Sequence, residues 1–338
     1  MGLRKYMAKR VAISLLTLFV VMNLNFWIFI LHPGDPTRFL LDPGMLPAQK
    51  QMIRDMYGVD EPIYIQYVKY MKNLASFGLL PPYFGFSHKS HEYVADEMAW
   101  RLPFTVALLG TALIGEIIIG IPVGILTASK RGSKLDVAIT GAGLFTYGVP
   151  TFFIQLFALF FLVSLVYRTY GIFIFPSSGW MSYPVPEGIL NQLANIAWHM
   201  ALPVATLVIA AFAWWALYTR NMLLDVLTQD YILTARAKGL RERTVLLKHA
   251  LRSIYPQIAT MITLSIPGLV TGAIITETVF GLNGIGKWYI DSLSISQPDY
   301  PVVQAVLFIF AVLTIVCNLI ADLVYGVLDP RISVGARK

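Results

Sequence analysis

Long apolar runs, separated by more polar segments, dominate the sequence. A membrane-spanning helix needs about 20 consecutive, mostly apolar residues. Six runs reach that length: 11–31, 103–128, 137–167, 196–218, 257–279 and 301–327. The pattern therefore predicts an all-α integral membrane protein with six transmembrane helices. Pro150 predicts a kink within the third of them.

Composition excludes several other classes of protein. Hydrophobic residues make up 57% of the chain and charged residues 13%, whereas soluble domains have about 45–50% and about 25%. Cys317 is the single cysteine, which excludes a disulfide framework, a thiolate metal cluster and a CxxC redox pair. The sequence shows no nucleophile–base or metal-ligand constellation. We therefore expect no catalytic residue, no cofactor and no metal site in this chain.

Positive charge is concentrated on one side of the predicted spans. With a cytoplasmic N-terminus, 17 of the 26 Lys and Arg residues fall in the shorter, inside segments, as the positive-inside rule requires. The basic start resembles a secretory signal, but the apolar run is long and no cleavage site follows. We expect a retained anchor helix within 1–31 and a cytoplasmic tail at 328–338. The net charge of +7 thus reflects topology and not binding to nucleic acid.

The longest polar segment, residues 32–102, follows the first span. Apolar spacing predicts helices over 47–57 and 62–77, with a turn at 58–62 between them. We expect a small extracytoplasmic subdomain here, long enough to receive a partner. A core of five transmembrane helices follows at 103–327.

The most informative polar segment is residues 219–256, here called the basic loop. Its first half predicts a helix that ends in cationic side chains and stops at Gly239, which suits the left-handed position after a helix. Its second half predicts a basic amphipathic helix that returns to the membrane at Pro256. Two short helices joined by a glycine turn would form a compact knob. An ordinary positively charged loop is the alternative interpretation.

The basic loop resembles the EAA loop of binding-protein-dependent ABC importer permeases. Aligned on Gly239, it matches the family pattern at Ala235 and Leu251 and departs from it at Leu233 and Thr234. The amino-acid sequence of residues 234–240 is similar to the one typical of the dipeptide/oligopeptide/nickel branch. Further motifs of that branch lie at 33–36, 101–106, 120–124, 276–280, 299–304 and 322–331. By these motifs the chain resembles the first of the two permease subunits in that branch.

The resemblance implies a type I ABC importer fold in a prokaryotic inner membrane. It implies a heterodimer with a second permease subunit, an extracytoplasmic substrate-binding protein, and two cytoplasmic ATPase subunits that bind the ATP and magnesium. The basic loop would then be the coupling element that sits in a groove of the ATPase. The residues expected at this contact are Ala235, Arg236, Lys238, Gly239, Leu240 and Arg241. Gly239 would set the turn, Ala235 and Leu240 the packing, and the basic residues the pairing with acidic ATPase side chains.

The substrate class stays open at this point. Di- and oligopeptides are commonest in the branch, and oligosaccharides or nickel are the alternatives. A stand-alone channel or secondary transporter is the alternative of a different class, and an integral-membrane enzyme is a third. Residues 281–287 mimic a phosphate-binding loop, but Trp288 stands where magnesium binding needs Ser or Thr, and the segment faces outside.

Ionisable groups inside predicted spans by default mark a transport path. Glu116 is the candidate path residue, and a bond to a neighbouring helix is its alternative role. Asp322 lies near the cytoplasmic end of the last span and is a weaker candidate. His88 and His91 lack a third ligand, so a solvated loop is favoured over a metal site.

Overall fold

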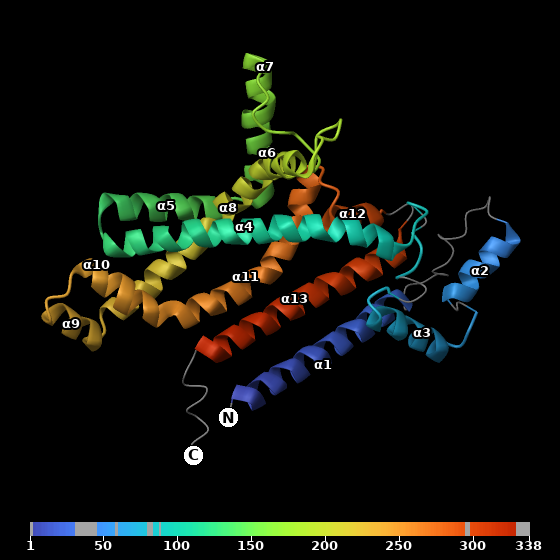
Figure 1. Ribbon diagram of the computed structural model, residues 1–338, viewed down its shortest axis with the longest axis horizontal. Coiled ribbons are helices and arrows are strands. Elements are labelled where there is room, and N and C mark those ends of the chain that lie inside the picture. Colours follow the sequence, from blue (N-terminus) through green and yellow to red (C-terminus); the bar gives the residue numbers. More distant parts are fainter. Residues whose placement is uncertain are drawn as a thin grey trace. The chain divides into compact units, whose positions relative to one another are not determined.

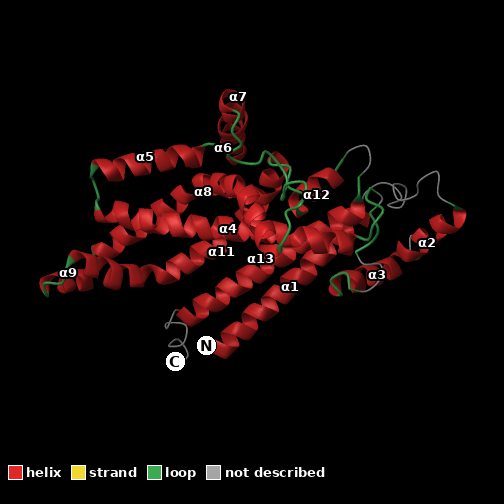
Figure 2. Ribbon diagram, turned by 45° about the horizontal axis from the view of Figure 1, so that its top comes forward, coloured by secondary structure: helices red, strands yellow, loops and turns green. Residues whose placement is uncertain are grey.

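The computed structural model describes residues 3–30, 46–57, 60–79, 84–87, 89–294 and 298–328. The motif at 33–36, His88 and residues 329–338 of the tail lie outside these ranges. Secondary structure within them is helical, apart from one isolated antiparallel bridge between Phe86 and Tyr93 (Figures 1 and 2). The chain divides into two compact units: unit one is formed by residues 106–282 and the chain from 324, unit two by 2–105 and 283–323.

Among the residues that the structure describes, five helical stretches are long and apolar enough to cross a membrane. They are Lys5–Phe29 within α1 (Leu3–Ile30), Val94–Ser129 (α4), Thr151–Tyr170, Ile189–Leu227 (α8) and Tyr300–Ile320 within α13 (Tyr300–Leu328). The remaining predicted run, 257–279, lies within α11 (Leu251–Val279), a helix of 29 residues. The prediction of an all-α protein with several membrane-length helices is confirmed.

The predicted third span, 137–167, is wrong as one kinked helix. It is divided into α5 (Lys134–Gly148), α6 (Thr151–Ala158), the π-helical turn η1 (Leu159–Leu165) and α7 (Val166–Tyr170). Val149 is extended, with a ψ of 127°, and Pro150, the N-cap of α6, is also non-helical, with a ψ of 135°. The cause is local: proline disfavours the helical conformation of the residue before it and has no N–H to continue the helix. The membrane-length stretch therefore starts only at Thr151.

Unit two contains the predicted subdomain helices and the first and last long helices. Helix α2 spans Pro47–Tyr57, as predicted, and α3 spans Ile63–Ala75, within the predicted 62–77; α12 (Ile285–Ser292) precedes α13. Contacts that join α1 to α13 include a hydrogen bond from the Asn25 amide to the Gln304 carbonyl at 3.0 Å and an ion pair between Arg10 and Asp322 at 3.1 Å. Asp322 therefore has a cationic partner on α1.

Unit one is organised around α8, a helix of 39 residues against which α5, α6 and α11 pack. After α8 come α9 (Asp230–Ala237), α10 (Glu242–Thr244) and the π-helical turn η2 (Val245–Ala250), which continues into α11. Figure 1 shows α9 and α10 at the same end of unit one as the turn between α4 and α5. The basic loop is therefore an extension of the two long helices α8 and α11.

Candidate functional site

The basic loop is held in place through the apolar face of α9. Ile232 and Ala235 lie three residues apart, on one face of the helix, and both are buried. They form one cluster with residues of α4, α8, η2 and α11: Ala128, Leu223, Val245, Ala250 and Ile254. The Tyr231 hydroxyl donates to Ser253 Oγ at 2.8 Å and also joins α9 to α11. These contacts fix α9 to the long helices.

A Schellman motif closes α9 and confirms the predicted glycine turn. Lys238 is the C-cap, and Gly239 follows it with a φ of 75°, in the left-handed region. The Gly239 N–H donates to the Arg236 carbonyl at 2.9 Å, and the Leu240 N–H donates to the Ala235 carbonyl at 3.4 Å. A Cβ added at Gly239 would meet no described atom within 4 Å. Glycine is therefore needed here for its backbone conformation and not for space.

An ion pair braces the two sides of this turn. Arg236 Nη2 and Nε donate to Glu242 Oε1 and Oε2 at 2.6 and 3.1 Å. These hydrogen bonds lower the pKa of Glu242 and raise the pKa of Arg236. The side chains are 38% and 60% exposed, so the pair contributes at most about 1 kcal/mol to stability. Because Arg236 is paired within the loop, the surplus positive charge of the exposed turn at 236–241 lies on Lys238 and Arg241.

The structure brings the six predicted contact residues together around the turn and divides them into two groups. Ala235 faces the chain's own core and is 6% exposed. The exposed group consists of Arg236, Lys238, Gly239, Leu240 and Arg241. Packing by Ala235 is therefore internal to this chain. Of the six predicted contact residues, the five exposed ones are available to another protein.

The second helix of the basic loop is continuous with α11. Val245, Leu246 and Ala250 are buried, while Leu247 and Lys248 are exposed. This two-sided arrangement confirms the predicted amphipathic helix. A continuous helical segment therefore connects the exposed turn at 236–241 to α11, and a movement of the turn can be passed along it.

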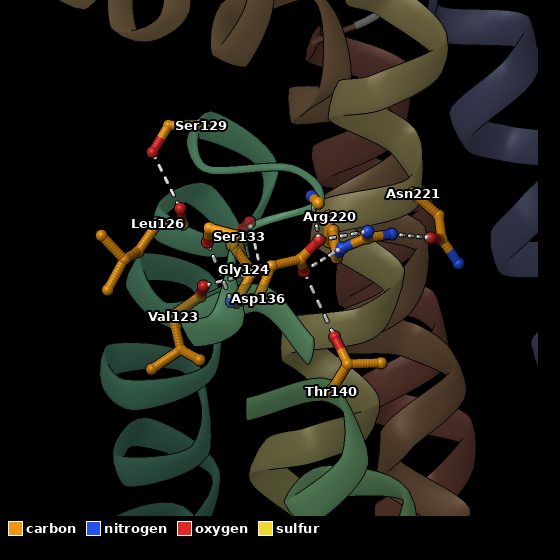
Figure 3. A network of polar contacts seen from close by, with 11 residues as sticks. Val123, Gly124, Leu126, Ser129, Ser133, Asp136, Thr140, Arg220 and Asn221 are labelled. Carbon is orange, nitrogen blue, oxygen red and sulfur yellow. Dashed lines mark hydrogen bonds and ion pairs between the residues drawn. The ribbon is translucent and has the colours of Figure 1, made fainter. Parts of the chain in front are cut away.

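A second polar cluster lies at the same end of unit one (Figure 3). Arg220 Nε donates to Asp136 Oδ1, and Arg220 Nη2 donates to Asp136 Oδ2, both at 2.8 Å. The Gly132 N–H donates to Oδ2 at 2.9 Å, and Ser133 Oγ caps α5 by accepting from the Asp136 N–H at 3.2 Å. The Arg220 hydrogen bonds are the main cause that lowers the pKa of Asp136, to about 2. The pair ties the α4–α5 turn to α8, which leads into the basic loop.

Sequence reasoning missed this pair. Asp136 and Arg220 lie 84 positions apart, in two different polar segments of the sequence. The available signal is the Ser-x-x-Asp pattern at 133–136, a helix-start pattern. That pattern marks the start of α5 but carries no information about the partner on α8.

Glu116 lies at a close contact between α4 and α8. It is buried, and Trp215 Nε1 donates to its Oε2 at 3.1 Å. A Cβ added at Gly120 would lie 2.3 Å from Trp215 Cβ, and one added at Gly124 would lie 2.5 Å from the Ala216 carbonyl oxygen. Close helix packing at these glycines follows directly. The hydrogen bond from Trp215 supports the alternative role of Glu116, in which its side chain binds a neighbouring helix.

The membrane-length helices define a multi-pass α-helical membrane protein. Family comparison makes this class more specific. The chain matches the binding-protein-dependent transport system inner membrane component over residues 120–334, and the N-terminal part of such membrane components over residues 3–109. The chain therefore belongs to the family of binding-protein-dependent transport system inner membrane components.

Individual relatives match over nearly their whole length. The oligopeptide transport system permease protein AppB of Bacillus subtilis (strain 168) is 35% identical over 329 residues, which cover 97% of this chain and 99% of AppB. The dipeptide transport system permease protein DppB of Escherichia coli (strain K12) is 34% identical, covering 97% and 98%. The glutathione transport system permease protein GsiC of Shigella flexneri serotype 5b (strain 8401) is 32% identical, with the same coverage. The resemblance drawn from the sequence motifs is confirmed, and the chain is a membrane permease component of a binding-protein-dependent transporter.

Proposed function

We propose that this chain is the first of two permease subunits in an ATP-driven importer of di- and oligopeptides. The names of the relatives support peptides over oligosaccharides or nickel, because the three compared relatives are permeases for oligopeptides, dipeptides and glutathione, itself a tripeptide. A second, homologous permease subunit completes the transmembrane part. A binding protein delivers the substrate outside, at residues 32–102, and two ATPase subunits bind ATP and magnesium in the cytoplasm, where both termini of this chain lie.

The observation that carries this proposal is the construction of the basic loop. Its exposed turn is closed by the Schellman motif at Gly239, and its buried face is packed on α8 and α11. A force applied to the exposed turn would therefore move α9 as a rigid element. Leu223 of α8 and Ile254 of α11 belong to the same cluster as Ile232, so this movement would be passed to both long helices.

The chemistry of the exposed turn fits an acidic groove on an ATPase. Lys238 and Arg241 present cations on either side of Gly239, and Leu240 presents an exposed apolar side chain. Burial of Leu240 would contribute to affinity through the hydrophobic effect. The cations would favour the correct orientation through electrostatic complementarity. ATP-driven closure of the ATPase subunits would then alternate access to the path between outside and inside.

Purification of the chain from its native membrane tests the proposal. We expect an ATPase to co-purify with it, and we expect peptide uptake into reconstituted vesicles to require ATP, magnesium and the binding protein. Calorimetry of the partner binding protein with panels of peptides, oligosaccharides and nickel identifies the substrate class. Substrate flux in the absence of any ATPase would instead favour the stand-alone channel or secondary transporter.

A further inference from the structure

A groove of about 570 Å³ lies in unit one, where α4 ends beside the second helix of the basic loop. Residues of α4 and of the α10–η2 segment line it: Pro122, Ile125, Leu126, Ser129, Glu242, Arg243, Leu246 and Leu247. Five of these eight are apolar residues, and Leu126 and Leu247 remain exposed. The groove is thus an open apolar surface between the end of α4 and the α10–η2 segment of the basic loop.

Positive charge accompanies this apolar surface. Arg243 lines the groove and is exposed, and it has no hydrogen-bond or ion-pair partner within the part of the chain that the structure describes. Glu242 also lines the groove, but its carboxylate is engaged by Arg236. Lys130 and Arg131, both exposed, follow the last residue of α4 directly. The surroundings of the groove therefore hold an excess of cationic side chains.

We propose that this groove binds one acyl chain of an anionic phospholipid, with the lipid phosphate on Arg243. A ligand of this groove has to offer an apolar part to the apolar wall and an anionic group to the guanidinium of Arg243 beside it. An anionic phospholipid carries both complementary parts, and basic pockets at the cytoplasmic ends of transmembrane helices are typical sites for such headgroups. The assignment to the cytoplasmic leaflet rests on the orientation given under the proposed function.

Lipid retention by the intact complex tests the assignment. The complex is purified from its native membrane, incubated with phosphatidylglycerol or with phosphatidylcholine of the same chain length, and examined by native mass spectrometry. We expect phosphatidylglycerol to be retained in preference to phosphatidylcholine. Arg243→Gln should lower phosphatidylglycerol retention about fivefold, the effect of one basic residue near an anionic headgroup. It should lower phosphatidylcholine retention less, because the choline cation cancels the net charge of that headgroup.

A matched control separates a defined site from general surface charge. Arg252→Gln removes an exposed charge from the same basic loop, but Arg252 does not line the groove, so retention should stay at the wild-type level. Leu126→Trp, at an exposed position, should fill the groove and lower retention of both lipids.

Several results would overturn the assignment. Equal retention of the two lipids would do so, and so would equal losses in Arg243→Gln and Arg252→Gln. Cross-linking of a cysteine at position 126 to a co-purified permease subunit would show that protein, not lipid, covers the groove. Because lipid retention is measured without transport, failure of peptide import would refute the proposed function and leave this inference standing.

Discussion

The ion pair between Asp136 and Arg220, whose side chains are 4% and 19% exposed, is expected to be one of the strong stabilising contacts of unit one. Arg220→Met removes the guanidinium and keeps a long side chain, so the main loss is the charge and its hydrogen bonds. Asp136, 4% exposed in its side chain, then keeps the Gly132 N–H and the Thr140 hydroxyl as donors. Breaking a buried pair costs about 3–5 kcal/mol. Because two donors remain and Arg220 is partly exposed, we expect a loss of at most about 3 kcal/mol at neutral pH.

The same contact also changes the titration of Asp136. Its pKa is lowered from 3.8 to about 2, which corresponds to about 2 kcal/mol of stabilisation of the ionised form. Since the folded state holds the lower pKa, this stabilisation is fully present above about pH 4 and is lost as the pH falls towards 2. Arg220→Met should therefore flatten the fall in stability over that range.

A double-mutant cycle measures the coupling directly. The free energy of unfolding is determined in mixed detergent micelles for wild type, Asp136→Asn, Arg220→Met and the double variant. We expect a coupling energy of about 2 kcal/mol for this pair. The exposed pair Arg236 and Glu242, treated in the same way, serves as the control and should give less than about 1 kcal/mol. Additive losses at positions 136 and 220 would refute the reasoning.

Further predictions concern topology, the tip of the basic loop and helix packing. In a variant without the native cysteine, an impermeant thiol reagent should label Ser90→Cys in intact cells and label Arg252→Cys only after permeabilisation. Labelling of position 252 in intact cells would contradict the predicted topology. Arg236→Glu should weaken ATPase association, with a smaller effect at high salt, while unfolding free energy should change by less than about 1 kcal/mol. Combining it with Glu242→Arg restores an ion pair between positions 236 and 242 but reverses its direction on the exposed turn. The unfolding free energy should therefore recover fully, and ATPase association, judged by co-purification, should recover only in part. Gly120→Ala should lower the melting temperature and the yield of folded protein, because the added methyl would lie 2.3 Å from a side-chain atom of α8; an unchanged melting temperature would show that α4 and α8 separate readily.

Local features of this fold are readable in the sequence because their causes are local. The bounds of α2 and the conformation of Gly239 follow from apolar spacing and from a cationic helix end followed by glycine. At Pro150 the same reasoning identified the right residue but underestimated its effect, since the complete break depends on the extended conformations of Val149 and Pro150.

Contacts between distant segments were beyond the reach of sequence pattern. Asp136 and Arg220 lie on different helices, and nothing near either residue specifies the other. The direction of Ala235 depends on the cluster that it joins with α4, α8 and α11, so its inward position required the tertiary structure. The likeness of the basic loop to a coupling element could be recognised from residues 234–240, but the division between its buried and exposed residues could not.

The central claim, that the basic loop couples ATP hydrolysis to transport, is tested most directly by substituting two glycines of similar positive φ. Gly239 and Gly171 both have positive φ, 75° and 69°, and a Cβ at either would meet no described atom within 4 Å. Valine at either position is therefore expected to cost about 1–3 kcal/mol locally, but only Gly239 lies in the basic loop. The measurement is ATPase activity in reconstituted vesicles, with and without peptide-loaded binding protein. The account predicts that Gly171→Val retains the stimulation and that Gly239→Val loses it, together with peptide uptake; normal stimulation and uptake in Gly239→Val would contradict the account.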